Sequence, residues 1–61
     1  MLKIGDRVSL YKGNARQFGR VVHIERRCRT TKRDYYYVSF ALVEWDNGGS
    51  DMVPFENLRR D

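Results

Sequence analysis

Five glycines divide this chain into short segments rich in β-branched and aromatic residues, and no long stretch shows helical periodicity. Short segments of this kind, bounded by glycine and asparagine turns, are typical of the strands of a small all-β protein. The chain has 61 residues, which is the size of one domain with a small core. We therefore predict a single all-β domain over residues 1–61, without a linker or an internal repeat.

The alternation of apolar side chains and the turn residues predict where the strands lie. Strands are expected at residues 7–11, 19–26, 35–45 and 50–53, with loops at 12–17 and 27–34 and a tight turn at 46–49. Pro54 is expected to end the fourth strand, because proline has no N–H to donate to the ladder. One short helical turn and a brief fifth strand at Arg59 and Arg60 complete the predicted chain.

The long third strand carries apolar residues of both parities. One set comprises Tyr36, Val38, Phe40 and Leu42, and the other comprises Tyr37, Val43 and Trp45. We therefore expect a bulge or a sharp bend near Ala41, where the inward face switches. At the start of this strand, Tyr36 is predicted to point inward, with Tyr35 and Tyr37 outward. Phe18 is expected to fold back onto the core.

Charge is distributed unevenly along the chain, which has a formal net charge of +4. Residues 1–33 carry ten cations against two acids, whereas residues 34–61 carry two cations against six acids. This asymmetry favours an anionic partner or two faces of opposite sign. In the alternative interpretation, folding mixes the two halves and the charges only keep the chain soluble.

The most distinctive functional feature is a cationic segment followed directly by tyrosines. Its basic residues are Arg26, Arg27, Arg29, Lys32 and Arg33. Guanidinium forks bind pairs of phosphate oxygens, and tyrosine rings such as Tyr35 and Tyr37 can stack on unpaired bases. Two other interpretations stay open, namely a solvated loop next to structural tyrosines and a surface that docks an acidic protein.

The remaining chemistry-bearing residues argue against an enzyme or a metal site. Cys28 is the only cysteine and His23 the only histidine, so neither an internal disulfide nor an ordinary zinc site is expected. Asp46 and Asp51 flank the tight turn and are interpreted as turn residues. No nucleophile–base pair is evident, so no catalytic residue and no cofactor are predicted.

The sequence also bears on the expected compartment. No apolar run approaches the roughly 20 residues of a membrane span. The N-terminal residues MLKIGD lack the pattern of a signal peptide. We therefore expect a reducing, cytoplasmic location.

The order of these elements resembles the small SH3-like barrels of the Tudor and KOW type. The resemblance is carried by the segments IGDRVSLY, FGRVVHI, YYVSF and VEWDNGGSDMVPFENL, which cover most of the chain. The matching turn and core positions are Gly5, Asp6, Val8, Gly19, Val21, Ile24, Trp45, Asp46, Gly48, Pro54 and Leu58. The resemblance implies a five-stranded SH3-like barrel with a short 3-10 turn near the C-terminus. This family includes nucleic-acid binders, readers of methylated residues and protein-docking modules.

Within that family, the loops after the first and second strands lie near each other. The resemblance therefore implies that the cationic segment forms one patch with the secondary candidates Lys12, Arg16 and Arg20. The cationic segment has no glycine, unlike the corresponding connection of nucleic-acid-binding KOW elements. A Tudor-like cage for methylated residues would draw its rings from Tyr11, Phe18, Tyr35, Tyr37, Trp45 and Phe55.

Taken together, these features predict a non-enzymatic module that binds RNA or DNA. The alternatives are a module that docks an acidic protein surface and a Tudor-like reader of methylated residues. Plasmid-borne dihydrofolate reductases share the barrel, but their V-Q-I-Y strand segment is not found here, and the only glutamine is Gln17.

Overall fold

Five antiparallel strands form one sheet in the computed structural model, which describes residues 1–61. The elements are β1 (Arg7–Lys12), β2 (Ala15–Thr30), β3 (Tyr35–Trp45), β4 (Ser50–Pro54), the 3-10 turn η1 (Phe55–Asn57) and β5 (Arg59–Arg60). The strand order is β4-β3-β2-β1-β5, so β4 and β5 are the two edges of the sheet. The all-β prediction and the short 3-10 turn are confirmed. The hydrogen-bonded ladder is not closed into a barrel.

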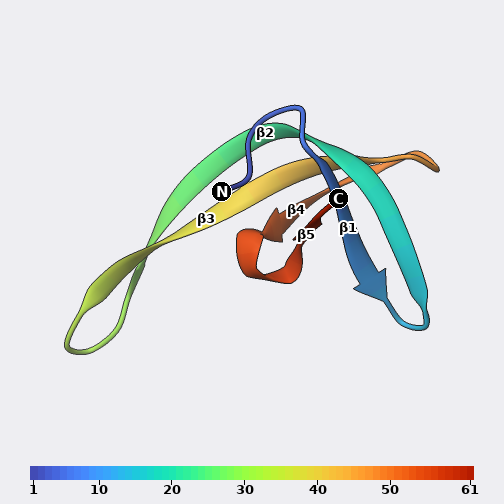
Figure 1. Cartoon of the computed structure of the whole chain (residues 1–61). Coiled ribbons are helices and arrows are strands. Elements are labelled where there is room, and N and C mark those ends of the chain that lie inside the picture. Colours follow the sequence, from blue (N-terminus) through green and yellow to red (C-terminus); the bar gives the residue numbers. More distant parts are fainter.

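The sheet is bent into an arch (Figure 1). The long strands β2 and β3 form its span, the β1–β2 and β2–β3 turns lie at opposite ends, and η1 lies under the arch. The molecule is elongated as a result, with extents of 41 × 25 × 19 Å. We call the side of the sheet that faces η1 the concave face.

A β-bulge helps β2 to curve. The register shifts between Val21 and His23, which lie opposite consecutive residues of β3, so Val22 is the extra residue. The bulge predicted near Ala41 therefore lies in the partner strand instead. A bulge adds one residue to only one strand of a pair, and here it brings Val21 and Ile24 onto the same face.

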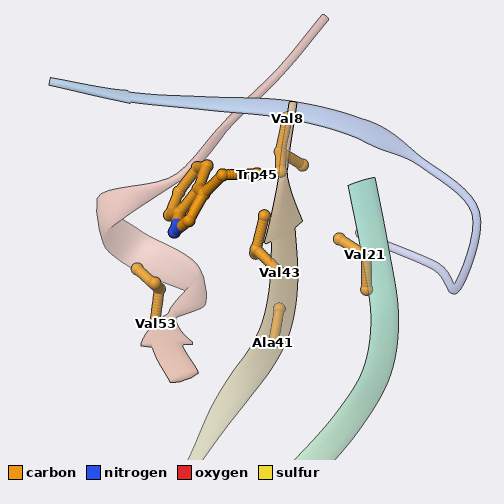
Figure 2. Close-up of a cluster of buried hydrophobic side chains, with 6 residues drawn as sticks. All are labelled: Val8, Val21, Ala41, Val43, Trp45 and Val53. Atoms are coloured by element: carbon orange, nitrogen blue, oxygen red, sulfur yellow. The ribbon is translucent and has the colours of Figure 1, made fainter. Parts of the chain in front are cut away.

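The core lies on the concave face (Figure 2). It consists of Val8, Val21, Ala41, Val43, Trp45 and Val53, and the partly buried Leu2, Leu10, Ile24, Phe55 and Leu58 pack against it. The indole Nε1 of Trp45 donates a hydrogen bond to Asp51 Oδ2 at 2.8 Å. Gly19 is buried between β1 and β3, where it lies opposite Val8 and Trp45.

Two predictions about the β1–β2 region are wrong. Residues 12–17 are not a loop, because a two-residue turn at Gly13 and Asn14 joins β1 directly to β2. Gly13 has φ of 65° and Asn14 is not left-handed, which matches a hairpin turn with glycine at its first central position. Phe18 does not fold back onto the core, because it lies opposite Ser9 on the outer, convex face and is 39% exposed. It shares that face with Arg16, whose guanidinium lies 5.4 Å from the Phe18 ring centroid.

The largest correction concerns the predicted loop at residues 27–34. β2 continues to Thr30, and residues 26–30 pair in register with residues 35–39 of β3, so only residues 31–34 form the connection. β1 pairs with β2 only as far as Arg20, and β4 pairs with β3 only from Phe40 onward. Residues 26–39 therefore project from the sheet as a two-stranded ribbon, which we call the arm.

Candidate nucleic-acid interface

The two faces of the arm carry different residues. Residues directly opposite each other on antiparallel strands point to the same side. Ile24 lies opposite the core residue Ala41, so the residues that follow Ile24 at alternate positions lie on the concave face. This face of the arm carries Arg26, Cys28, Thr30, Tyr35, Tyr37 and Ser39, and the convex face carries Arg27, Arg29, Tyr36 and Val38.

Three of the arm's four arginines lie over aromatic rings. The guanidinium of Arg26 is 5.0 Å from the ring centroid of Tyr37 on the concave face. On the convex face, Arg27 and Arg29 lie 5.3 and 5.9 Å from the Phe40 ring centroid. Each such contact contributes about 0.5–1 kcal/mol at an exposed site. These contacts orient the guanidinium groups, and the N–H groups of Arg26 and Arg29 remain available to an anion.

Acidic residues neutralise only part of the arm's charge, because five cations stand against Asp34 and Glu25. Glu25, at its base, accepts a hydrogen bond from Arg27 Nε at 2.7 Å. Arg26 and Arg29 form no ion pair. The one acid inside the arm, Asp34, is used by the chain itself, because its Oδ1 accepts the Tyr35 N–H at 2.8 Å.

The tip of the arm is a short, hydrogen-bonded loop. The Thr31 N–H donates to the carbonyl of Asp34 at 2.7 Å, and the Asp34 N–H donates to Thr31 Oγ1 at 3.1 Å. These bonds close residues 31–34 and leave the side chains of Lys32 and Arg33 exposed at the far end of the ribbon. The loop therefore presents two further cations on a defined backbone.

All three consecutive tyrosines of the arm are exposed. Tyr35 is 66%, Tyr36 50% and Tyr37 58% exposed. The prediction that Tyr36 points into the core is wrong, because the arm extends beyond the core and Tyr36 lies on its convex face. Tyr35 and Tyr37 share a face, as the sequence indicated, and they share it with Arg26.

The secondary cations lie elsewhere. Lys12 and Arg16 flank the β1–β2 turn, at the end of the arch opposite the arm, and Arg20 lies between the two ends of β2 (Figure 1). The single patch implied by the family resemblance is therefore not formed. Arg16 is also engaged within the fold, since its Nε donates to Ser9 Oγ at 3.0 Å and its Nη2 lies 3.5 Å from Asp61 Oδ1.

An ion pair that the sequence did not reveal joins the start of β1 to the β3–β4 turn. Arg7 donates two hydrogen bonds to the Asp46 carboxylate, at 2.7 and 2.6 Å. These bonds lower the pKa of Asp46 and raise the pKa of Arg7, in each case chiefly through the hydrogen bonding itself. Only the long-range pairing of the strands brings these two residues together.

The six rings proposed for a reader cage do not converge. Trp45 is buried in the core, and Tyr11 and Phe18 lie together with Arg16 at the β1–β2 end. None of the four surface cavities is lined by more than two of the six rings. The cavity that brings two together has Tyr37 and Phe55 in its wall.

Three further findings bear on the candidate site. No group of three or more histidine, cysteine or acidic side chains is placed to hold a metal ion. The structure contains no helix with the length and apolarity needed to cross a membrane. Comparison of the chain with protein-family models, curated proteins and solved structures gives no match.

Proposed function

We propose that this protein is a small non-enzymatic module that binds RNA or DNA mainly through phosphates, with the arm as its binding element. One observation carries the proposal: the arm concentrates five cations against a single acid of its own, Asp34, and one more at its base, Glu25. These cations are Arg26, Arg27, Arg29, Lys32 and Arg33. Glu25 is paired with Arg27, and Asp34 bonds the backbone of the loop. The net positive charge therefore extends along a projecting ribbon.

The arrangement suits a polyanion for two reasons. Cations on both faces and at the tip of a two-stranded ribbon can neutralise several phosphates at once, which is the main source of affinity in such complexes. The exposed rings of Tyr35 and Tyr37 add flat surfaces on which bases stack. The finer architecture, an SH3-like barrel of the Tudor and KOW type, belongs to the same proposal. The five antiparallel strands and the 3-10 turn between β4 and β5 support it.

The proposal is tested by the salt dependence of binding. The slope of log affinity against log salt concentration is about −0.7 to −0.9 for each phosphate neutralised. The double variant Arg26→Ala/Arg29→Ala should reduce the magnitude of this slope by about 1.4–1.8 if each arginine contacts one phosphate. Fluorescence anisotropy with labelled oligonucleotides measures the slope.

A charge-matched control separates the arm from the overall charge. Lys3→Ala/Arg59→Ala also removes two positive charges, but from exposed positions outside the arm. It should change the slope much less than the arm variant does. Equal effects of the two variants, or no measurable affinity of the parent at low salt, would refute the proposal.

A second candidate, docking of an acidic protein, has a specific observation in its favour. Residues 35–39 of β3 pair with β2 on one side, whereas β4 begins to pair with β3 only at Phe40. The other edge of this segment is therefore open to an added strand. Recovery of one stoichiometric protein partner, with binding that is insensitive to nuclease, would favour this function.

A further inference from the structure

A groove under the arch connects the concave face of the arm to β5. One cavity, of about 370 Å³, lies between Ile24 and Arg26 of β2, Tyr37 of β3 and Phe55 of η1. A neighbouring cavity shares Met1, Leu2 and Phe55 with it and extends the groove to Leu58 and Arg60. The volume of the first cavity lies within the ~300–1,000 Å³ of typical ligand pockets.

The walls of this groove combine aromatic and apolar surface with unpaired positive charge. No acidic residue lines either cavity, and each contains one arginine, Arg26 or Arg60. Neither arginine is in an ion pair. Arg60 lies opposite the core residue Val8 in the β1–β5 pair, so it is on the same concave face as Arg26. The two charges lie toward the two ends of a groove whose other lining residues are mostly apolar.

We infer that this groove binds single-stranded nucleic acid, with one base inserted between Tyr37 and Phe55 and the flanking phosphates on Arg26 and Arg60. This inference rests on the proposed function and specifies its substrate class. A base has apolar faces and carries phosphates on either side of its sugar, which matches an apolar slot between two cations. A base in a duplex is stacked and paired, so it has no free face to offer such a slot.

The geometry of Tyr37 supports a stacking role. Tyr37 is 58% exposed, although the guanidinium of Arg26 lies over its ring. Phe55 is held by the core, against which it packs from η1. The slot thus has two walls, Phe55, which the core holds in place, and Tyr37, which lies on the arm. An entering base would be enclosed between these two rings.

The test compares four labelled ligands on the full chain by fluorescence anisotropy. They are an oligothymidine of about ten nucleotides, the same strand with abasic central positions, a duplex of equal length, and an aspartate–phenylalanine peptide of similar charge. The abasic strand should bind at least about fivefold more weakly than the oligothymidine, because stacking one base contributes upward of about 1 kcal/mol. The duplex and the peptide should also bind more weakly than the oligothymidine.

Two leucine variants locate the base. Tyr37→Leu should lower the affinity for the oligothymidine by at least about fivefold and clearly reduce the difference between normal and abasic strands. Tyr36→Leu, on the same strand but on the convex face, should leave that difference intact. The ligand comparison on the parent protein needs no variant to fold, so it can still overturn the inference if Tyr37→Leu is unstable.

Each outcome has a distinct meaning. Equal binding of normal and abasic strands overturns the inference and leaves the proposed phosphate-binding function standing, as does tighter binding of the duplex. Tighter binding of the peptide overturns the inference and favours a protein-docking groove. If no nucleic acid binds at low salt, the proposed function itself fails.

Discussion

Replacing Gly19 with alanine should strongly destabilise the fold. A Cβ atom at this position would lie 2.5 Å from the carbonyl oxygen of Glu44, 2.7 Å from Val43 Cγ1 and 2.9 Å from Trp45 Cε3. The nearest of these atoms is backbone, and the ladder between β2 and β3 fixes its position. β2 cannot move away to relieve the clash, because β1 pairs with Gly19 on its other side.

The expected cost follows from the overpacking of a core. Extra methyl groups in well-packed sites cost about 1–3 kcal/mol, and a clash with backbone belongs at the upper end, near 3 kcal/mol. A domain of 61 residues has a free energy of unfolding of about 3–9 kcal/mol. The substitution should therefore remove a third or more of the stability and lower Tm by about 12–24 °C.

Urea unfolding followed by the fluorescence of Trp45, the single tryptophan, measures the change. Ser50→Ala, at an exposed position at the start of β4, is the control and should shift the free energy of unfolding by less than about 0.5 kcal/mol. If Gly19→Ala is as stable as this control, β2 and β3 do not approach each other as closely at Gly19 as described, and the reasoning is refuted.

Two further predictions concern side-chain pairs. The pKa of Asp46 lies below its usual value of 3.8 because Arg7 hydrogen-bonds its carboxylate, so this pair stabilises the fold above about pH 4 and the contribution is lost as the pH falls through the lowered pKa. Arg7→Gln should return the pKa of Asp46 toward its usual value in an NMR titration, and an unchanged pKa would show that the pair does not form. Asp51→Ala should cost about 1–3 kcal/mol in urea unfolding, because it leaves the nearly buried Trp45 N–H without an acceptor. Asp51→Asn, which keeps an oxygen in place, should cost clearly less, and equal costs would refute the role of this hydrogen bond.

The parts of the fold that the sequence predicted well are those with strong local signals. β3 has the predicted bounds, Tyr35–Trp45, because seven of its eleven side chains are aromatic or valine, residue types that favour strands. The turn at residues 46–49 is confirmed as well, with positive φ at Gly48 and Gly49. These features depend on neighbouring residues only.

The C-terminal end of β2 could not be predicted from its own residues, for a physical reason. Residues 26–30 have no apolar alternation, because both faces of the arm are exposed to solvent. They form a strand because their backbone pairs with residues 35–39. The backbone hydrogen bonds of such a ladder form whether the side chains are polar or apolar. Likewise, the mixed parity of β3 arises because Phe40 is covered by Arg27 and Arg29 on the convex face while Ala41 lies in the core.

The sequence indicates which residues could form the candidate site but not how they are arranged. The arginines and tyrosines were identified from their clustering, yet alternation along the ribbon divides them between two faces. Arg26, Tyr35 and Tyr37 lie together, and Arg27 and Arg29 lie opposite them. Phe55 and Arg60 lie near Arg26 and Tyr37 only because the C-terminal segment runs under the arch. The spacing of these residues in the sequence does not show this.

The arm is poorly suited to stabilising the fold, and this supports assigning a binding function to it. A two-stranded ribbon without a third strand or a packed face is marginal in water. Here it is supported by stacked arginines and a hydrogen-bonded tip, contacts that contribute little individually. Selection for stability alone would favour a short connection between β2 and β3 over a projecting ribbon with three exposed tyrosines and unpaired arginines. Because local departures from stabilising patterns tend to occur at functional sites, the arm and the groove at its base are where binding is expected.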